Sequence, residues 1–225
     1  MKKVLYLIAS ICIASLAFYA GKWHVSHDGE YFKRVYVSQR KAMLLSQAAQ
    51  TRVSDVLLLG DSLVDGMFVH SQNQLVFLAG IGMATVGDWI SFAPKLLEKL
   101  APRTVIIAIG INDTQKATGI TLNAFMAKYE ALSSLFSAHG VEVVLSSLLP
   151  VERGKPLGDA MFDTQLIAAI NRSIRELAMR AGYGFLDSHA LLVGPDGFLP
   201  KGLSRDGVHL TGEGYRRWKQ VLFPE

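Results

Sequence analysis

Short apolar runs alternate with longer stretches of helical periodicity along this chain, and no other feature constrains its fold as strongly. The runs are rich in leucine and β-branched residues without polar alternation, which is typical of strands buried on both faces. We expect strands over Val53–Leu59, Leu75–Leu78, Thr104–Ile109, Val141–Leu145 and Gly184–Leu186. We expect helices over about Val86–Leu100, Leu122–Ala138, Thr164–Ala181 and Gly212–Leu222. Such alternation predicts an α/β fold, a parallel sheet with helices on both sides.

Length and composition favour one domain. The chain has 225 residues, half of them hydrophobic, which is enough for a full core. No repeat or linker divides it, so we expect a domain over residues 53–225. An amphipathic helical segment over residues 22–52 precedes it, either as a stalk or packed on the domain's flank. The net charge of +4 is spread along the chain without a basic-aromatic stripe, so no nucleic-acid partner is expected.

The N-terminus has the pattern of an export segment. Lys2 and Lys3 precede an uncharged apolar stretch, Val4 to Ala20. We therefore expect residues 1–21 to be a signal peptide or an N-terminal membrane anchor, and both stay open beside the alternative of a buried core helix. The lysines hold the N-terminus in the cytoplasm, so we expect a periplasmic or secreted protein. A retained segment would associate it with the membrane through residues 4–20. The only cysteine, Cys12, lies in this segment, which excludes a cysteine nucleophile beyond it.

A serine follows the first predicted strand. In Gly60-Asp61-Ser62-Leu63, Ser62 comes two residues after the apolar run and should open the next helix. Unpaired backbone N–H groups at a helix start favour negative charge on a nearby oxygen. The alternative interpretation is an ordinary N-cap serine.

Two further motifs carry a histidine, an acid and an amide. Asp206 and His209 lie three apart before the last helix, and a bend at Gly207 would let the carboxylate reach one ring nitrogen while the other faces a serine. Asn112 follows the third strand in Gly110-Ile111-Asn112-Asp113, where its amide can donate to an oxyanion. The alternatives are a pair that caps the following helix and an asparagine that makes a turn.

Together the three motifs resemble those of the SGNH hydrolases, the GDSL esterase/lipase family. The resemblance implies that Ser62 is the nucleophile, with Asp206 and His209 completing a catalytic triad. It also implies an oxyanion hole made by the Ser62 N–H, the Asn112 amide and a glycine N–H. The implied fold is a three-layer α/β/α flavodoxin-like fold with a five-stranded parallel sheet, and no cofactor is expected.

The family's glycine motif is only partly matched. In Gly80-Ile81-Gly82-Met83-Ala84-Thr85 an ungapped alignment places Met83 where the glycine belongs. Gly82 takes that place if the loop differs by one residue, and we name Gly82 as the expected donor. Any residue but proline supplies an N–H, so Met83 stays open as the alternative.

These observations predict an exported serine esterase that hydrolyses carboxylic or thio esters, similar to lipases, lysophospholipases and arylesterases. Its partner would be a small-molecule ester or an acylated lipid or glycan. The alternatives are an O-acetyl esterase or acyltransferase acting on envelope carbohydrate, and a non-catalytic binding module. The remaining histidines lack ligand spacing, so no metal is expected. Some apolar residues near the motifs either line an acyl pocket or belong to the core: Leu63, Met67, Phe68, Met83, Leu148 and Leu149.

Overall fold

The structure, a computed structural model, describes residues 31–51, 53–69 and 74–223. The chain divides into two compact units, Met1–Arg40 and Lys41–Glu225, and residues 31–40 of the first are helical. The expected signal peptide or anchor, residues 1–21, lies outside the described residues. No helix within the described ranges combines the length and apolar character that a membrane crossing needs.

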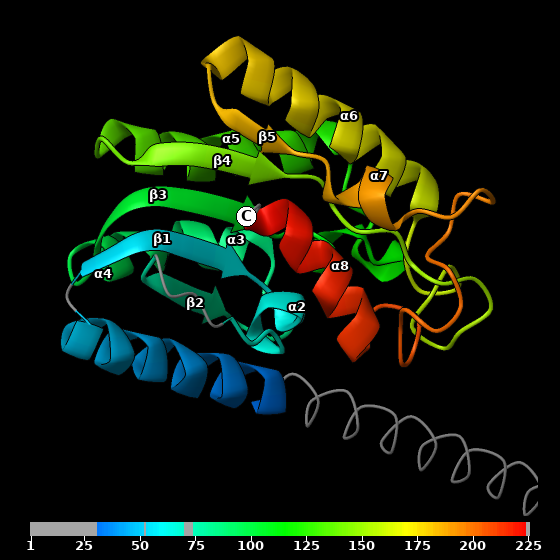
Figure 1. Ribbon diagram of the computed structural model, residues 1–225, viewed down its shortest axis with the longest axis horizontal. Helices are drawn as coiled ribbons and strands as arrows, with labels where there is room; N and C mark the ends of the chain where they lie inside the picture. Colours follow the sequence, from blue (N-terminus) through cyan, green and yellow to red (C-terminus); the bar gives the residue numbers. More distant parts are fainter. Residues whose placement is uncertain (1–30, 52, 70–73, 224–225) are drawn as a thin grey trace, which may run out of the picture. The chain divides into compact units, whose positions relative to one another are not determined.

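A five-stranded parallel sheet forms the centre of the second unit (Figure 1). Its strands are β1 (Val53–Gly60), β2 (Val76–Gly80), β3 (Ala101–Ala108), β4 (Glu142–Ser146) and β5 (Gly184–Leu186). Their order is β2-β1-β3-β4-β5, and every neighbouring pair is parallel. Each strand expected from the sequence is present; β5 has the expected bounds, and the ends of the others differ by a few residues at most. The predicted parallel sheet is therefore confirmed.

Helices lie on both sides of this sheet. They are α2 (Ser62–Asp65), α3 (Val86–Ile90), α4 (Ala93–Leu97), α5 (Leu122–Ala138), α6 (Thr164–Ala181), α7 (Ser188–Leu192) and α8 (Gly212–Leu222). In Figure 1, α8 lies in front of the sheet and α5 behind it. This confirms the predicted three-layer α/β/α fold.

The helix expected over Val86–Leu100 is instead two short helices, and Pro94 explains the difference. Proline lacks an N–H and its ring clashes with the carbonyl four residues earlier, here that of Ile90. The first helix accordingly ends at Ile90, and α4 begins at Ala93 with Pro94 in its first turn, where no N–H is needed. The next strand also begins earlier than expected, at Ala101.

Residues 41–51 are helical and pack on the domain. Leu44 and Ala48, four residues apart on one helix face, are fully buried. The Nζ atom of Lys41 donates to the carbonyl oxygen of Asp88 at 3.3 Å and lies 5.5 Å from the ring centre of Phe92. For this part of the segment, the structure favours packing on the domain's flank over a free stalk.

The register of the sheet brings three loops together. Gly60 at the end of β1 pairs with Gly80 of β2 on one side and with Ala108 of β3 on the other. The buried Trp89 of α3 donates its indole N–H to the Gly60 carbonyl at 3.0 Å, which fixes the end of β1. The loops after β1, β2 and β3 therefore leave the sheet at one level, at the edge where parallel α/β sheets bind ligands.

Candidate active site

Ser62 is the first residue of α2, and it does not cap that helix. The N-cap is Asp61, whose carboxylate Oδ1 accepts a hydrogen bond from the Leu63 N–H at 2.9 Å. The N-cap interpretation of Ser62 is therefore wrong. Its hydroxyl instead lies 2.9 Å from Nε2 of His209, across 147 residues of sequence.

His209 contacts Asp206 through its other ring nitrogen. Nδ1 lies 2.7 Å from Asp206 Oδ2, while Asp206 Oδ1 accepts the backbone N–H groups of Val208 at 3.1 Å and His209 at 2.9 Å. The N-cap of α8 is Thr211, so Asp206 and His209 do not cap the last helix as the alternative supposed. The structure thus brings Ser62, His209 and Asp206 into one hydrogen-bonded chain.

The electrostatics of this chain favour an ionised Asp206. Partial burial works to raise the pKa of Asp206, but the hydrogen bonds from the backbone and imidazole of His209 outweigh it and hold the pKa below its usual value. The side chains of His209 and Asp206 are 26% and 35% exposed, so a substrate can reach the site from solvent.

Asn112 connects two of the three loops. It begins the short 3₁₀ helix η1 (Asn112–Thr114), and its amide nitrogen donates to the carbonyl of Ala84 at 3.0 Å. Its amide oxygen accepts from Gln115 Nε2 at 3.3 Å. A carboxamide nitrogen carries two hydrogens, so one holds the loop after β2 and the second is available to a ligand.

The loop after β2 forms a tight turn. The N–H of Ala84 donates to the Ile81 carbonyl at 3.1 Å, which closes a four-residue turn with Gly82 and Met83 in the middle. Met83 has a φ of 62°, the left-handed region that favours glycine, and its side chain is 43% exposed. The N–H groups of Gly82 and Met83 donate to no residue in the described ranges. Both remain candidates for the oxyanion hole by this criterion.

Two buried carboxyl groups, those of Asp61 and Asp113, lie in the loops after β1 and β3. Asp61 is 1% exposed, and burial raises its pKa to about 7, with a contribution from the charge of nearby Asp113. Burial also raises the pKa of Asp113, to about 6. Asp113 Oδ2 accepts the Val86 N–H at 3.0 Å, which ties the loop after β3 to the start of α3.

Most of the apolar residues considered for an acyl pocket are core. Leu63, Met67, Leu148 and Leu149 are buried, whereas Phe68 is 77% exposed and Met83 is also at the surface. A void lined by Asp61, Leu63, Leu148, Leu149 and neighbours has a volume of about 10 Å³. That is room for about one water molecule and too little for an acyl chain.

Three residues near the site were not among the site residues predicted from the sequence. Tyr215 of α8 donates its hydroxyl to the Leu63 carbonyl at 2.9 Å, which anchors α8 beside α2. Glu152 and Ser204 are both buried and hydrogen-bonded to each other. A glutamate in a loop with glycine and proline normally predicts a solvated side chain, so the burial of Glu152 could not be foreseen.

No group of three or more His, Cys, Asp or Glu side chains in the described part of the chain is arranged to hold a metal ion.

Solved structures share the fold at low sequence identity. A Streptococcus pneumonia protein named for platelet activating factor superposes with a TM-score of 0.75 and 20% identity, over 86% of this chain and 96% of its own. A GDSL-like lipase from Bacteroides thetaiotaomicron superposes with a TM-score of 0.64 and 21% identity, over 84% of this chain and 94% of its own. A carbohydrate acetylesterase family member from Sinorhizobium meliloti superposes with a TM-score of 0.60 and 21% identity, over 77% of this chain and 96% of its own.

Sequence comparison identifies the family. No protein of curated function matches the chain. The family model for the GDSL-like Lipase/Acylhydrolase family matches residues 58–217, which include all three motifs and the whole hydrogen-bonded chain from Ser62 to Asp206. The protein is thus an ester-hydrolysing hydrolase and belongs to the GDSL-like Lipase/Acylhydrolase family.

Proposed function

We propose that the protein is a serine esterase in which Ser62 attacks the ester carbonyl. The observation that carries this proposal is the hydrogen-bonded chain Ser62 Oγ–His209 Nε2 at 2.9 Å and His209 Nδ1–Asp206 Oδ2 at 2.7 Å. An ionised Asp206 keeps the Nδ1 proton on His209, so Nε2 accepts the serine proton as Oγ bonds to the carbonyl carbon.

The two half-reactions follow from this arrangement. The tetrahedral intermediate collapses, the ester C–O bond breaks, and His209 gives its proton to the departing alcohol. An acyl group then remains on Ser62 Oγ. In the second half-reaction His209 takes a proton from water, the hydroxide attacks the acyl carbon, and the acid leaves as Ser62 regains its proton.

The oxyanion would be held by the N–H of Ser62, the free amide hydrogen of Asn112 and one N–H of the turn after β2. For the last donor we favour Met83 over Gly82. Positive φ is the conformation for which glycine is selected, and here it occurs at Met83. This agrees with the ungapped alignment, in which Met83 stands in the place of the family's glycine.

We expect a short-acyl substrate. The residues that could form a deep acyl pocket are packed into the core, and the void that Leu63, Leu148 and Leu149 line is only about 10 Å³. The test is hydrolysis of p-nitrophenyl acetate, butyrate, octanoate and palmitate by the protein from Lys22 onward, with Ser62→Ala as the control. Ser62-dependent activity that is highest on acetate or butyrate supports the proposal. An optimum at palmitate would contradict the short-acyl preference.

The same features support a second candidate, an O-acetyl esterase or acyltransferase that acts on envelope carbohydrate. An acetyl group needs no long pocket, and the export pattern of residues 1–21 would place the enzyme beside such glycans. Ser62-dependent acetate release from an O-acetylated polysaccharide, with little activity on p-nitrophenyl esters, would favour this candidate over a general esterase.

Export itself is part of the proposal. Its support is the Lys2-Lys3 pair followed by the apolar stretch Val4 to Ala20. Fractionation of cells that produce the full chain with a C-terminal tag tests it. Tagged protein in the periplasm, medium or membrane fraction is expected, and tagged protein confined to the cytoplasm would refute export.

A further inference from the structure

The loop that carries Asp206 and His209 is held by a second segment, residues 151–162. The N–H of Glu152 donates to the Gly207 carbonyl at 2.8 Å, and the N–H of Leu157 donates to the Asp206 carbonyl at 3.0 Å. The 151–162 segment thus bonds to both residues at the bend between the acid and the histidine.

Two glycines show how closely these backbones approach. A Cβ at Gly207, where φ is 120°, would lie 2.6 Å from the Leu157 carbonyl carbon. A Cβ at Gly158 would lie 2.0 Å from the Glu152 carbonyl oxygen. Neither position has room for a side chain. At Gly207 the catalytic loop and the 151–162 segment form one tightly packed layer, and at Gly158 the segment packs closely on itself.

A buried carboxyl group lies within this layer. Glu152 is 3% exposed, and its Oε2 accepts a hydrogen bond from Ser204 Oγ at 2.6 Å. The same Ser204 oxygen accepts the N–H of Gly207 at 3.0 Å. A hydroxyl has only one hydrogen to donate. Because the Ser204 hydroxyl donates it to Glu152, the Ser204 oxygen can only accept a hydrogen bond from Gly207.

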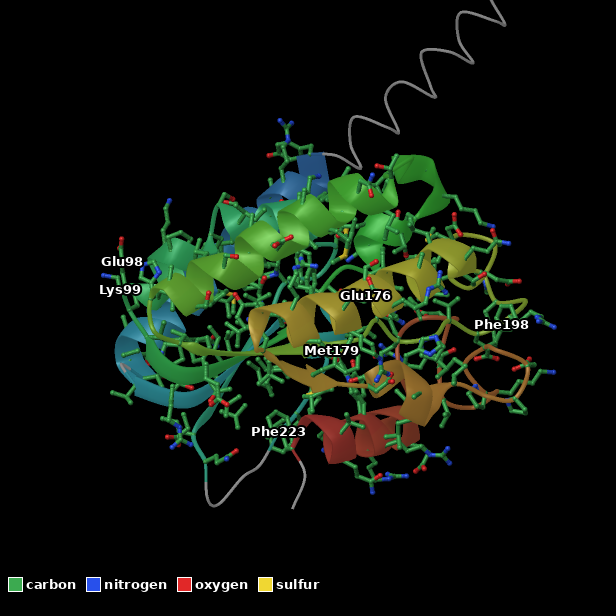
Figure 2. All side chains as sticks on the ribbon, turned by 90° about the horizontal axis from the view of Figure 1, so that it is seen from above. Glu98, Lys99, Glu176, Met179, Phe198 and Phe223 are labelled. Atoms are coloured by element: carbon green, nitrogen blue, oxygen red, sulfur yellow. The ribbon has the colours of Figure 1, made fainter. Side chains whose placement is uncertain are left out.

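The first residues of the 151–162 segment are held in place as well. The N–H of Leu199 donates to the Val151 carbonyl at 2.9 Å. The Arg153 guanidinium lies over the ring of Phe198, 3.9 Å from its centre. Figure 2 shows Phe198 among the loops beyond the carboxyl ends of the strands. Glu152 is therefore flanked by anchored residues and has a fixed position of its own.

Resting on the function proposed above, we propose that Glu152 is a positioning residue for catalysis, which acts through Ser204 and Gly207 to set where Asp206 and His209 meet Ser62. Gly207 lies between Asp206 and Val208, and Asp206 Oδ1 in turn holds the N–H groups of Val208 and His209. A shift of Gly207 therefore moves Asp206 and His209 relative to Ser62.

The test compares kcat and KM for Glu152→Ala, Glu152→Gln and Ser204→Ala on the best p-nitrophenyl ester. Because a misplacement of about 1 Å can cost about 10²-fold in rate, we expect Ser204→Ala and Glu152→Ala to lower kcat by about 10- to 100-fold while KM stays within about twofold. Glu152→Gln keeps an acceptor oxygen and should recover most of the rate. The double variant Glu152→Ala/Ser204→Ala should have a kcat no lower than that of the slower single variant, because Glu152 and Ser204 act through the same chain of hydrogen bonds.

Ser147→Ala is the matched control. Ser147 is also buried, donates to a carboxylate oxygen of Asp187 at 3.2 Å and accepts the His189 N–H at 2.8 Å, but makes none of these bonds to the catalytic loop. We expect it to cost comparable stability and leave kcat unchanged. An equal loss of kcat in Ser147→Ala, or wild-type kcat in Ser204→Ala, would overturn the role of Glu152. If Glu152→Ala does not fold, Ser204→Ala and Glu152→Gln decide alone.

A readout without substrate separates this inference from the proposed function. The Nδ1 proton of His209, hydrogen-bonded to Asp206, should give a downfield proton NMR resonance that shifts or broadens in Ser204→Ala and stays unchanged in Ser147→Ala. An unchanged resonance in Ser204→Ala overturns the positioning. A shifted resonance in a protein whose hydrolysis does not depend on Ser62 would leave the positioning intact and overturn the proposed function.

Discussion

Replacing Asp61 by asparagine should alter how the stability of the protein depends on pH. Asp61 is buried beside Ser62, and its carboxyl group has a pKa of about 7 in the folded protein against 3.8 for an ordinary aspartate. Between these values the folded state holds a proton that the unfolded state has lost. Stability contributed by this site is therefore present below about pH 4 and decreases as the pH rises toward 7.

The pKa shift sets the size of the effect. Three pKa units at about 1.4 kcal/mol each correspond to ~4 kcal/mol lost between pH 4 and neutral pH. Asparagine has nearly the same shape, keeps an oxygen that can accept the Leu63 N–H, and does not ionise. We expect the stability of Asp61→Asn relative to the wild type to increase by about 2–4 kcal/mol from pH 4 to pH 8.

Urea denaturation at half-unit pH steps between 4 and 8 measures this difference. Glu130→Gln serves as the control, because that carboxylate lies at the surface of α5 with its side chain 51% exposed. We expect the control to follow the wild type closely. If Asp61→Asn and the wild type show the same pH dependence, Asp61 ionises freely in the folded state and the account of its burial is wrong.

Three further predictions concern the reaction. Asn112→Ala should lower kcat by about 10²–10³-fold with a melting temperature close to that of the wild type, measured by steady-state kinetics and calorimetry, and wild-type turnover would remove Asn112 from the oxyanion hole. Gly82→Pro deletes the Gly82 N–H at a turn position that tolerates proline. If Met83 is the oxyanion donor, Gly82→Pro should be as active as Gly82→Ala. A loss of about 10²-fold or more relative to Gly82→Ala would assign the donor role to Gly82. His209→Gln should lower kcat/KM by about 10²–10⁴-fold, because no group is then left to take the Ser62 proton, and wild-type kcat/KM would contradict His209 as the base.

The sequence was sufficient for the sheet and for the meeting of Ser62, His209 and Asp206. Strands buried on both faces leave long apolar runs, and residues just after parallel strands must converge at one edge. The three-residue spacing of Asp206 and His209 across Gly207 then limits which ring nitrogen the carboxylate can reach. Their catalytic roles, and that of Asn112, stay predictions.

Other features depend on packing that no local pattern encodes. Leu63 and Leu149 are apolar whether they line a pocket or fill the core, and only the folded structure shows them buried. Glu152 belongs to a residue type that is usually solvated, so its burial against Ser204 had no sequence signal. The break at Pro94, by contrast, was readable from the missing N–H of proline, and the expected single helix should have been divided there.

Intact-mass analysis after treatment with a fluorophosphonate tests the central claim most directly, because the reagent reacts with an activated serine and reports the modified residue. Wild-type protein should gain one adduct, peptide mapping should place it on Ser62, and ester hydrolysis should be lost in proportion. Ser62→Ala should stay unlabelled, with kcat reduced by about 10³-fold or more. Labelling at another residue, or a Ser62→Ala variant that hydrolyses esters at the wild-type rate, would contradict the assignment of Ser62 as the nucleophile.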